Sequence, residues 1–502
     1  MQDEINLDTV SSTSPLFIDL INARPLDVHT WSDYPVVNLF VDNIYSSLSS
    51  VEGNERINKK LLKVLLLDLY VAWCADPELK LMFSRDNNAY KAKSRYNEIH
   101  IGKKITEIVD LLVLNKLIHE KKGFNDRING IGFQSRIWPT TELIKQFEDA
   151  RFSQFITNDH VDREVIVLRD EDKNDIEAYM EPPFIKRSRK LLQAYNKLLS
   201  QTHIDIYNLQ KPVIEIGNGK KKMKLQITQK DKFVRRIFNN SRWDQGGRFY
   251  GGWWQRCPKE YREKIEFDGV GGLEVDFSGM HIVILYAQEG INYWADIGDD
   301  PYSIKQIKAI DPKIDLRSAC KLLLLTAINA NSPQKAFQAF RQQSAPGSLE
   351  KKLTNAQLSK LLDTLGSKHQ PIVHKLASGA GIDLMFVDSQ ITEKLIDRFT
   401  NHYRCPILAI HDSYIVPFGY DKRLAEEMQL AFQEITKISN PIVKPVTDYY
   451  DVLQMPIELI DNAERLAKYT PTTRHLREKE EFRLAKNKPQ IEPWYPTWTS
   501  IY

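Results

Sequence analysis

The first strong pattern of hydrophobic positions lies in the N-terminal third of the chain. Residues 55–73 place a nearly continuous apolar run after a polar start, which predicts a buried helix. A second helical period spans 104–116, after a turn around Ile101. Residues 117–140 predict two short strands around a basic, glycine-containing loop. Ahead of these elements, residues 1 to about 50 predict an irregular lead-in with one short helix.

This order of two helices and a basic β-hairpin resembles winged-helix DNA-binding domains in pattern, over roughly residues 55–150. Such a domain would insert its second helix into a DNA groove and lay its wing along the phosphates. Lys121, Lys122 and Arg127 are the expected wing residues. The alternative is a helical packing domain with an exposed hairpin, and the pattern does not decide between the two.

The rest of the chain mixes strand-like and helical patterns. A charged connector at 170–179 precedes an amphipathic helix at 185–201. A strand-like run spans Leu273–Ala287, and Ile407–Pro417 predicts a buried hairpin with polar residues at its tip. A helix is expected within 315–332. The domain boundary is expected between about 155 and 185.

Composition is ordinary for a globular protein. The 502 residues are 42% hydrophobic and 27% charged, which allows two or three domains with their own cores. No apolar run is long enough to span a bilayer, and the N-terminus has no basic-then-apolar signal pattern. The cysteines are far apart and show no metal or disulfide spacing: Cys74, Cys257, Cys320 and Cys405. A reducing, cytoplasmic setting is the default expectation.

Net charge alone does not indicate a nucleic-acid partner, because it is only +3. Basic clusters nevertheless occur at 186–190, 220–224 and 232–236. Each one alone is typical of a solvated surface. Their concentration ahead of the richest motif region favours phosphate contact.

That motif region begins at residues 242–265, where two Gly-Gly pairs frame Arg248 among aromatic residues. Arginine can bind a phosphate in a bidentate fork, and the rings of Tyr250, Trp253 and Trp254 could stack on bases. Glycines there would let the backbone approach a ligand. The competing interpretation is a Trp-rich turn that fills a core groove.

Two aspartates, Asp276 and Asp412, follow or lie between apolar strand patterns but stand 136 positions apart. Alone, Asp412 suits a tight turn. Together at the ends of neighbouring strands, the two could hold the pair of divalent cations used in phosphoryl transfer.

Between these aspartates lies the predicted helix of 315–332. Arg317, Lys321, Leu325 and Asn329 recur every four residues and so share one helix face. A helix that presents Arg and then Lys to a cleft can hold a triphosphate. The competing interpretation is a buried helix with a charged edge.

The order of these motifs resembles the family A DNA polymerases and the related single-subunit RNA polymerases of phages and mitochondria, over about residues 230–460. The matching segments, in chain order, are Asp244 to Arg248 with Gln255 and Pro258, Asp276-Phe277-Ser278 with His281, Asp299 to Ile304, Arg317 with Lys321, and His411-Asp412-Ser413. Three features depart from the DNA enzymes: His281 replaces a Glu, Asn329 replaces a Tyr, and Ser413 matches the RNA enzymes.

The resemblance implies an α+β polymerase right hand in a compact, divergent member of the superfamily. The palm would carry an antiparallel sheet, with helical fingers and thumb, behind a mainly helical and winged-helix-like N-terminal domain. The expected divisions are a lead-in at 1–54, the helical domain at 55–160, a connector with thumb-like helices at 161–240, palm and fingers at 241–465, and a tail at 466–502.

It also implies a role for each matching residue. Asp276, Asp412 and the backbone carbonyl of Phe277 would bind two Mg²⁺ ions, with Mn²⁺ as a substitute, and Arg317 and Lys321 would hold the incoming triphosphate. The remaining nucleotide-binding residues would be His281, Leu325 and Asn329, and the nucleic-acid-binding residues would be Arg248, Gln255, His411, Tyr250, Trp253 and Trp254.

The implied activity is addition of nucleotides to a 3′ hydroxyl, most simply by a template-directed DNA polymerase. The implied partners are a DNA template–primer and nucleoside triphosphates, with no membrane. The alternatives are an RNA polymerase or primase that uses RNA, a phosphoryl hydrolase with the same carboxylates, and a non-catalytic nucleic-acid binder with a relic palm. The aromatic tail at 488–502 is expected to wrap across a groove of the same molecule, with partner binding as its alternative.

Overall fold

The computed structural model describes residues 22–49, 51–86, 89–126, 131–217, 223–308, 310–439, 441–445 and 470–487. Helices and mainly antiparallel strands make it an α+β protein, as predicted. Two hydrophobic cores are present, one formed by residues between Val37 and Ile156 and the other by residues between Val165 and Phe432. We call the parts around them the N-terminal domain (residues 22–159) and the C-terminal domain (residues 160–487).

The N-terminal domain surrounds the long helix α3. Its helices are α2 (Pro35–Ser47), α3 (Glu55–Ala75), α4 (Ile105–Leu114) and α5 (Thr141–Ala150), with the short turn η2 (Gln154–Ile156). Its strands are β1 (Ala23–Pro25), β2 (Thr30–Trp31), β3 (Lys80–Phe83), β4 (Ile118–Lys121), β5 (Phe124–Asp126), β6 (Ile131–Phe133), β7 (Ser135–Pro139) and β8 (Asn158–Asp159).

Helix α3 forms where the sequence predicts it, and its side chains from Leu61 to Leu69 are buried. The predicted lead-in is not separate from this domain, because Val37, Phe40 and Ile44 of α2 pack into the same core.

The predicted hairpin contains four short strands rather than two. Strands β4 and β7 pair antiparallel, and β5 and β6 pair as an extension of the same hairpin. Strand β3 pairs with the other edge of β7, giving the sheet order β1-β3-β7-β4. Arg127, expected on the wing, lies outside the described residues.

Helix α4 does not suit the predicted role in a DNA groove. Its exposed positions are Glu107, Asp110, Val113 and Leu114. Two carboxylates on the exposed face repel phosphates, and two apolar side chains offer them no hydrogen bond. The exposed face of α4 is thus acidic and apolar, and its predicted insertion into a DNA groove stays a prediction.

The C-terminal domain contains the larger core. Its helices are α6 (Pro183–Gln201), α7 (Lys259–Arg262), α8 (Met280–Gln288), α9 (Leu316–Asn329), α10 (Pro333–Gln343), α11 (Asn355–Lys368), α12 (Gly381–Asp397), α13 (Asp421–Thr436) and α16 (Thr473–Ala485), with short turns η4 (Trp253–Arg256), η5 (Tyr293–Ile297), η6 (Glu350–Lys352), η7 (Gln370–Lys375) and η8 (Arg398–His402). Its strands are β9 (Ile166–Leu168), β10 (Ile204–Ile206), β11 (Val213–Ile216), β12 (Met223–Gln226), β13 (Arg235–Phe238), β14 (Gly246–Tyr250), β15 (Ile265–Phe267), β16 (Val270–Phe277), β17 (Leu408–Ile410), β18 (Ser413–Pro417) and β19 (Val443–Pro445).

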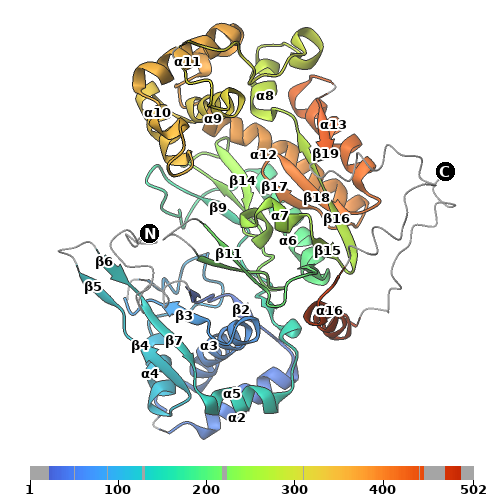
Figure 1. Cartoon of the computed structure of the whole chain (residues 1–502). Helices are drawn as coiled ribbons and strands as arrows, with labels where there is room; N and C mark the ends of the chain where they lie inside the picture. The colour runs from blue at the N-terminus through green and yellow to red at the C-terminus, as the bar shows by residue number, and fades with distance from the viewer. Residues whose placement is uncertain are drawn as a thin grey trace, which may run out of the picture.

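A six-stranded sheet occupies the middle of this domain. Its order is β10-β15-β16-β18-β17, and β19 adds to the C-terminal half of β16. Helices α9, α10 and α11 gather at one end of the molecule, and the N-terminal domain lies at the other end (Figure 1). Helices α12 and α13 lie beside the sheet between these ends (Figure 1).

Two predicted elements differ from the structure. The run Leu273–Ala287 is not one strand, because β16 ends at Phe277 and helix α8 begins at Met280. Gly279 permits the change of direction with a φ of 66°. An apolar run does not by itself distinguish a strand from a buried helix. Residues 161–240 contain α6 as their described helix, and its buried face belongs to the main core, so the predicted set of thumb-like helices is wrong.

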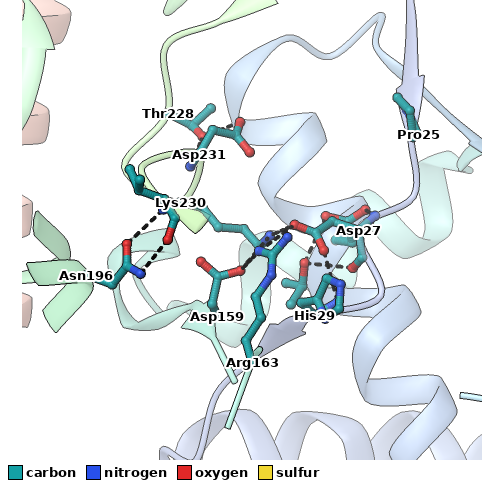
Figure 2. A network of polar contacts seen from close by, with 12 residues as sticks. Pro25, Asp27, His29, Asp159, Arg163, Asn196, Thr228, Lys230 and Asp231 are labelled. Atoms are coloured by element: carbon teal, nitrogen blue, oxygen red, sulfur yellow. Dashed lines mark hydrogen bonds and ion pairs between the residues drawn. The ribbon is translucent and has the colours of Figure 1, made fainter. Parts of the chain in front are cut away.

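A partly buried ionic network joins the two domains. Lys230 and Arg163 both approach the carboxylate of Asp27, and Arg163 also pairs with Asp159 (Figure 2). Burial alone would raise the pKa of Asp27, but Lys230 and Arg163 hold that pKa well below its usual range. Asp27 therefore stays charged and ties β1–β2 to the C-terminal domain.

Helix α16 closes the far edge of the central sheet. Asp205 of β10 lies directly opposite Glu266 of β15, and His475 of α16 bridges them, with Nδ1 2.6 Å from Asp205 and Nε2 3.0 Å from Glu266. Arg474 donates to both carboxylate oxygens of Asp205 at 2.8 and 3.1 Å. The helix also touches the N-terminal domain, where Phe482 packs edge-on against Phe155. In the described part of the chain, no helix is long and apolar enough to cross a membrane.

Candidate active site

The hairpin and the long strand bring the two predicted aspartates together. Strands β17 and β18 are joined by the two-residue turn His411-Asp412, with His411 at a φ of 59°. Strand β16 pairs with β18 so that Asp276 lies opposite Ser413. The amide of Phe277 also donates to the carbonyl of Asp412 at 3.2 Å. Asp276, near the end of β16, and Asp412, in the turn that precedes β18, therefore lie next to each other at one end of the sheet.

The electrostatics of Asp276 reflect this proximity. Burial and the nearby charge of Asp412 raise the pKa of Asp276 from 3.8 to about 7. Lys321 acts in the opposite direction, but too weakly to compensate. Two carboxylates thus share a partly buried site in which no described side chain offsets the rise in the pKa of Asp276.

This donor set fits a hard divalent cation. Mg²⁺ is commonly bound by one or two carboxylates, with substrate phosphates and water completing its shell. Within the described ranges, no group of three or more His, Cys, Asp or Glu side chains is arranged to hold a metal on its own. Asp276 and Asp412 would accordingly hold the cation jointly with a phosphate-bearing substrate.

Helix α9 presents its predicted cations beside this site. Arg317 and Lys321 are both exposed, and each lies 5.7 Å from the ring centre of the buried Tyr302. Arg317 also pairs with Asp300. Burial and the charges of Asp412 and Asp300 raise the pKa of Tyr302, which keeps its hydroxyl protonated. Tyr302 therefore connects the cationic face of α9 to the two aspartates.

The other two residues on this helix face make contacts within the protein, although Asn329 is exposed. Leu325 is half-buried, and its carbonyl accepts a hydrogen bond from the amide of Asn329 at 2.8 Å. The Asn329 side chain lies against Gly381 at the start of α12, where a Cβ would come within 2.1 Å of its oxygen. Asn329 thus lies close to the start of α12, and its predicted contact with nucleotide stays a prediction.

Arg248 of β14 is held by two side chains. Its Nε donates to Oδ2 of Asp388 at 2.6 Å, and its Nη2 lies 2.8 Å from Nε2 of His281. A guanidinium has no acceptor, so Nε2 of His281 must accept and its proton resides on Nδ1. Burial and the charge of Arg248 lower the pKa of His281 to about 4, which agrees with a neutral ring.

Asp388 is the buried partner in this arrangement. It lies on α12, is 1% exposed, and its Oδ1 has no hydrogen-bond partner among the described residues. Burial raises the pKa of Asp388 to about 6, and Asp412 adds to the rise while Arg248 opposes it. A third acidic group therefore lies within electrostatic reach of the paired aspartates.

The polar residues of the hairpin tip have different partners. His411 has an exposed side chain, but partial burial of its ring and the charge of Arg248 lower its pKa. Ser413 is buried and donates to Glu274 at 2.6 Å, and Glu274 in turn receives two hydrogen bonds from Arg262 at 2.9 Å each. Ser413 thus anchors the turn, whereas His411 is open to a ligand.

The predicted stacking role of the two tryptophans is wrong. Trp253 and Trp254 are 1% and 0% exposed and belong to the main core, so neither ring face can reach a base. The interpretation of a Trp-rich turn that fills the core is confirmed for this pair. Gln255 uses its amide internally, since Nε2 donates to the carbonyls of Phe249 and Ala409. Tyr250 remains half-buried on the same side of β14 as Arg248.

The glycine pairs serve packing rather than ligand approach. Gly247 has a φ of 72° at a bulge between β13 and β14, and a Cβ there would meet Phe238 and Ser389 at 2.9 Å. At Gly252 a Cβ would lie 2.2 Å from the ring of Trp254. Both glycines are needed to seat aromatic side chains.

Comparisons with known proteins add little to this geometry. No protein-family model matches the sequence, and no curated protein matches it. Among solved structures, the chain is similar to the POL domain of Pol1 from M. smegmatis in complex with a DNA primer-template and dNTP. The identity is 12%, the TM-score is 0.29, and the match covers 82% of this chain and 68% of that chain. So low a TM-score does not establish a shared fold.

Three residues of the site escaped the sequence interpretation: Tyr302, Asp388 and Glu274. Tyr302 lies inside the segment 299–304 that resembles the polymerase link, but the resemblance assigned no role to this residue. Asp388 and Glu274 carry no local signal, because their partners Arg248 and Ser413 are 140 and 139 positions away.

Proposed function

We propose that this protein is a nucleotidyltransferase that adds nucleotides to a 3′ hydroxyl by two-metal phosphoryl transfer. The observation that carries the proposal is the juxtaposition of Asp276 and Asp412 at one end of the sheet, with the pKa of Asp276 raised to about 7. A purely structural carboxylate pair would be expected to have a cationic partner. Here Lys321 of α9 opposes the rise in the pKa of Asp276 without offsetting it, and α9 is where a substrate triphosphate would be bound.

The proposed roles follow from the positions of the side chains. Asp276 and Asp412 would hold two Mg²⁺ ions, with the Phe277 carbonyl as a further ligand. Bound divalent cations would activate the attacking hydroxyl and neutralise charge on the leaving pyrophosphate. Arg317 and Lys321 would bind the triphosphate and keep it in line for attack at the α-phosphate.

We further propose that the substrate strand lies against Arg248 and His411, and that the enzyme is a template-directed DNA polymerase of the family A type. In this assignment the central sheet is the palm and helices α9–α11 are the fingers. Arg248 is preorganised by Asp388 and His281, which favours a fixed contact with a primer end over a mobile phosphate contact.

A second candidate, an RNA polymerase or primase, is favoured by one observation. Because Nε2 of His281 accepts from Arg248, Nδ1 carries a proton that can be donated to a ligand. At the position where the DNA enzymes exclude the ribose 2′-hydroxyl, a donor of this kind could bind that hydroxyl instead.

The test is incorporation of labelled nucleotide on a primed template with Mg²⁺, with deoxynucleotides and ribonucleotides offered separately. Asp412→Asn removes one charge with little change in shape, and the exposed Asp363 of α11 gives the matched control Asp363→Asn. Incorporation by the wild type and by Asp363→Asn, but not by Asp412→Asn, supports the proposal. Binding of nucleic acid without any incorporation would instead identify a non-catalytic binder, and release of monophosphates without a primer would identify a hydrolase.

A further inference from the structure

The N-terminal domain contains a cavity that belongs to no part of the proposed active site. It has a volume of about 720 Å³ and lies between α2 and α3, with Trp31 of β2 in its wall. Ligand sites commonly fall between about 300 and 1,000 Å³, so this cavity is large enough for a small organic ligand rather than a bare ion.

The cavity is lined by a row of cations on one side of α3. Arg56, Lys59, Lys60 and Lys63 contribute to its wall, against a single lining carboxylate, Asp42. Their spacing of three and four residues places them on adjacent turns of the helix. The surplus positive charge predicts an anionic ligand.

These cations differ in whether they form ion pairs with carboxylates. Lys59 pairs with Asp42 at 2.8 Å and with Glu55 at 2.7 Å. In the described part of the chain, neither Arg56 nor Lys60 forms an ion pair with a carboxylate. Burial and the charge of Arg56 lower the pKa of Lys60, as expected for a cation that lacks a counter-charge. Two adjacent cations on α3 are therefore available to a ligand.

Lys63 is the most deeply buried cation in the lining of the cavity. Lys63 is 7% exposed, donates to the Ser32 carbonyl at 2.7 Å and lies 4.2 Å from the ring centre of Trp31. Burial lowers the pKa of Lys63, although Asp33 and Asp42 oppose that change. The buried ammonium of Lys63 therefore adds a third positive charge to the wall that carries Arg56 and Lys60.

We propose that the cavity between α2 and α3 binds a phosphate group carried by a nucleotide, either free or at the end of a nucleic-acid strand. The guanidinium of Arg56 can bind two phosphate oxygens in a fork, and Lys60 adds a compact charge beside it. The size of the cavity accommodates the nucleoside that carries the phosphate. This site is separate from Asp276 and Asp412, and the proposal stands whether or not those aspartates are catalytic.

The test uses the full chain without divalent cations and a short, 3′-labelled single-stranded oligonucleotide with either a 5′-phosphate or a 5′-hydroxyl. Fluorescence anisotropy gives the affinity, and unlabelled nucleoside monophosphate and inorganic phosphate serve as competitors. The variant is Arg56→Gln with Lys60→Gln, and the matched control is Lys145→Gln on an exposed position of α5. Because Arg56 is exposed, Arg56→Gln alone serves as a second variant with little risk to folding.

We expect the double variant to bind the phosphorylated probe about tenfold more weakly, and the control to bind within about twofold of the wild type. Preference for the phosphorylated end identifies a strand terminus, whereas stronger competition by nucleoside monophosphate identifies a free nucleotide. A photoreactive group on the 5′-phosphate should label residues 31–63. Equal affinities of the double variant and the control for every probe, or labelling confined to residues 241–445, would overturn the proposal.

Discussion

Two pairs of acidic side chains lie on the central sheet and differ in how their charge is balanced. Asp205 and Glu266 face each other on β10 and β15, while Asp276 and Asp412 meet near the ends of β16 and β18. The first pair receives Arg474 and His475 from α16. At the second pair, Lys321 opposes the rise in the pKa of Asp276 without offsetting it, and Lys444 of β19 lies opposite Asp276 in the strand register.

The difference in charge balance lowers the pKa of Asp205 and leaves the pKa of Asp276 raised. Burial alone would raise the pKa of Asp205, but His475 and Arg474 lower it. Burial alone would lower the pKa of His475, because it disfavours the charged form of this group too, but Asp205 and Glu266 raise that pKa. The charged forms of these side chains are therefore stable together. At Asp276 burial and Asp412 act together, and the pKa rises to about 7. A carboxylate pair balanced from within the chain serves stability, whereas an unbalanced pair marks a place for a proton or an external cation.

The strongest test of this difference is substitution of Asp276 and Asp412. Asp276→Asn and Asp412→Asn should each lower the rate of nucleotide incorporation by about a thousandfold, because each removes a charged ligand from the proposed cation site. Neither change should lower the thermal midpoint, since each also removes a like-charge repulsion. Primer-extension rates and thermal unfolding measure the two effects. Loss of stability with retained activity would show that these carboxylates are structural.

The opposite outcome is expected at the balanced pair. Arg474→Met should destabilise folding by about 3–5 kcal/mol, because Asp205 and Glu478 would keep buried charge without this partner. Incorporation per folded molecule should not change. Chemical denaturation measures the effect, with Arg477→Met on the exposed side of the same helix as control. Equal stability of the two variants would contradict a stabilising role for the cluster.

A smaller effect is expected where Arg248 is positioned. Arg248→Lys keeps the charge but cannot contact Asp388 and His281 at once, so extension of a primer should slow by about ten- to a hundredfold. The exposed Arg242 lies nearby in the same segment and supplies the control Arg242→Lys. If Arg248 positions the primer, the loss should appear mainly in the apparent affinity for primer–template. A uniform loss with every substrate and a lower thermal midpoint would indicate general misfolding.

The smallest effect concerns pH. The folded chain holds the proton of Asp276 more tightly than the ordinary value of 3.8 allows, with a pKa of about 7. This contribution to stability is fully present below pH 3.8 and is lost as the pH rises through 7. Mg²⁺ should therefore raise the thermal midpoint by about two degrees at pH 8 and hardly at all at pH 5.5. Asp276→Asn should abolish this pH dependence, and a Mg²⁺ effect that is equal at both pH values would contradict the assignment.

Local spacing predicted several parts of the site. The helix with Arg317 and Lys321 and the hairpin around Asp412 both form where their patterns place them. The meeting of Asp276 with Asp412 was inferred from resemblance, and the register of β16 and β18 agrees with it.

What the sequence could not reveal depends on distant partners. Asp388 has its role because it pairs with Arg248, which is 140 positions away. His475 has its role because it contacts Asp205, which is 270 positions away. Trp253 and Trp254 show the converse, because aromatic residues beside glycine and arginine are equally typical of a binding surface and of a core. Only their burial at 1% and 0% separates the two interpretations.

The docking of α16 has a consequence for synthesis of the protein on the ribosome. This helix is the last described element to leave the exit tunnel, yet it carries the cations that balance Asp205 and Glu266. Until it emerges, the nascent sheet edge holds two carboxylates without their counter-charges, and the contact of Phe482 with Phe155 cannot form. Completion of the fold is thereby coupled to the emergence of α16, and both domains should mature together once this helix has left the exit tunnel.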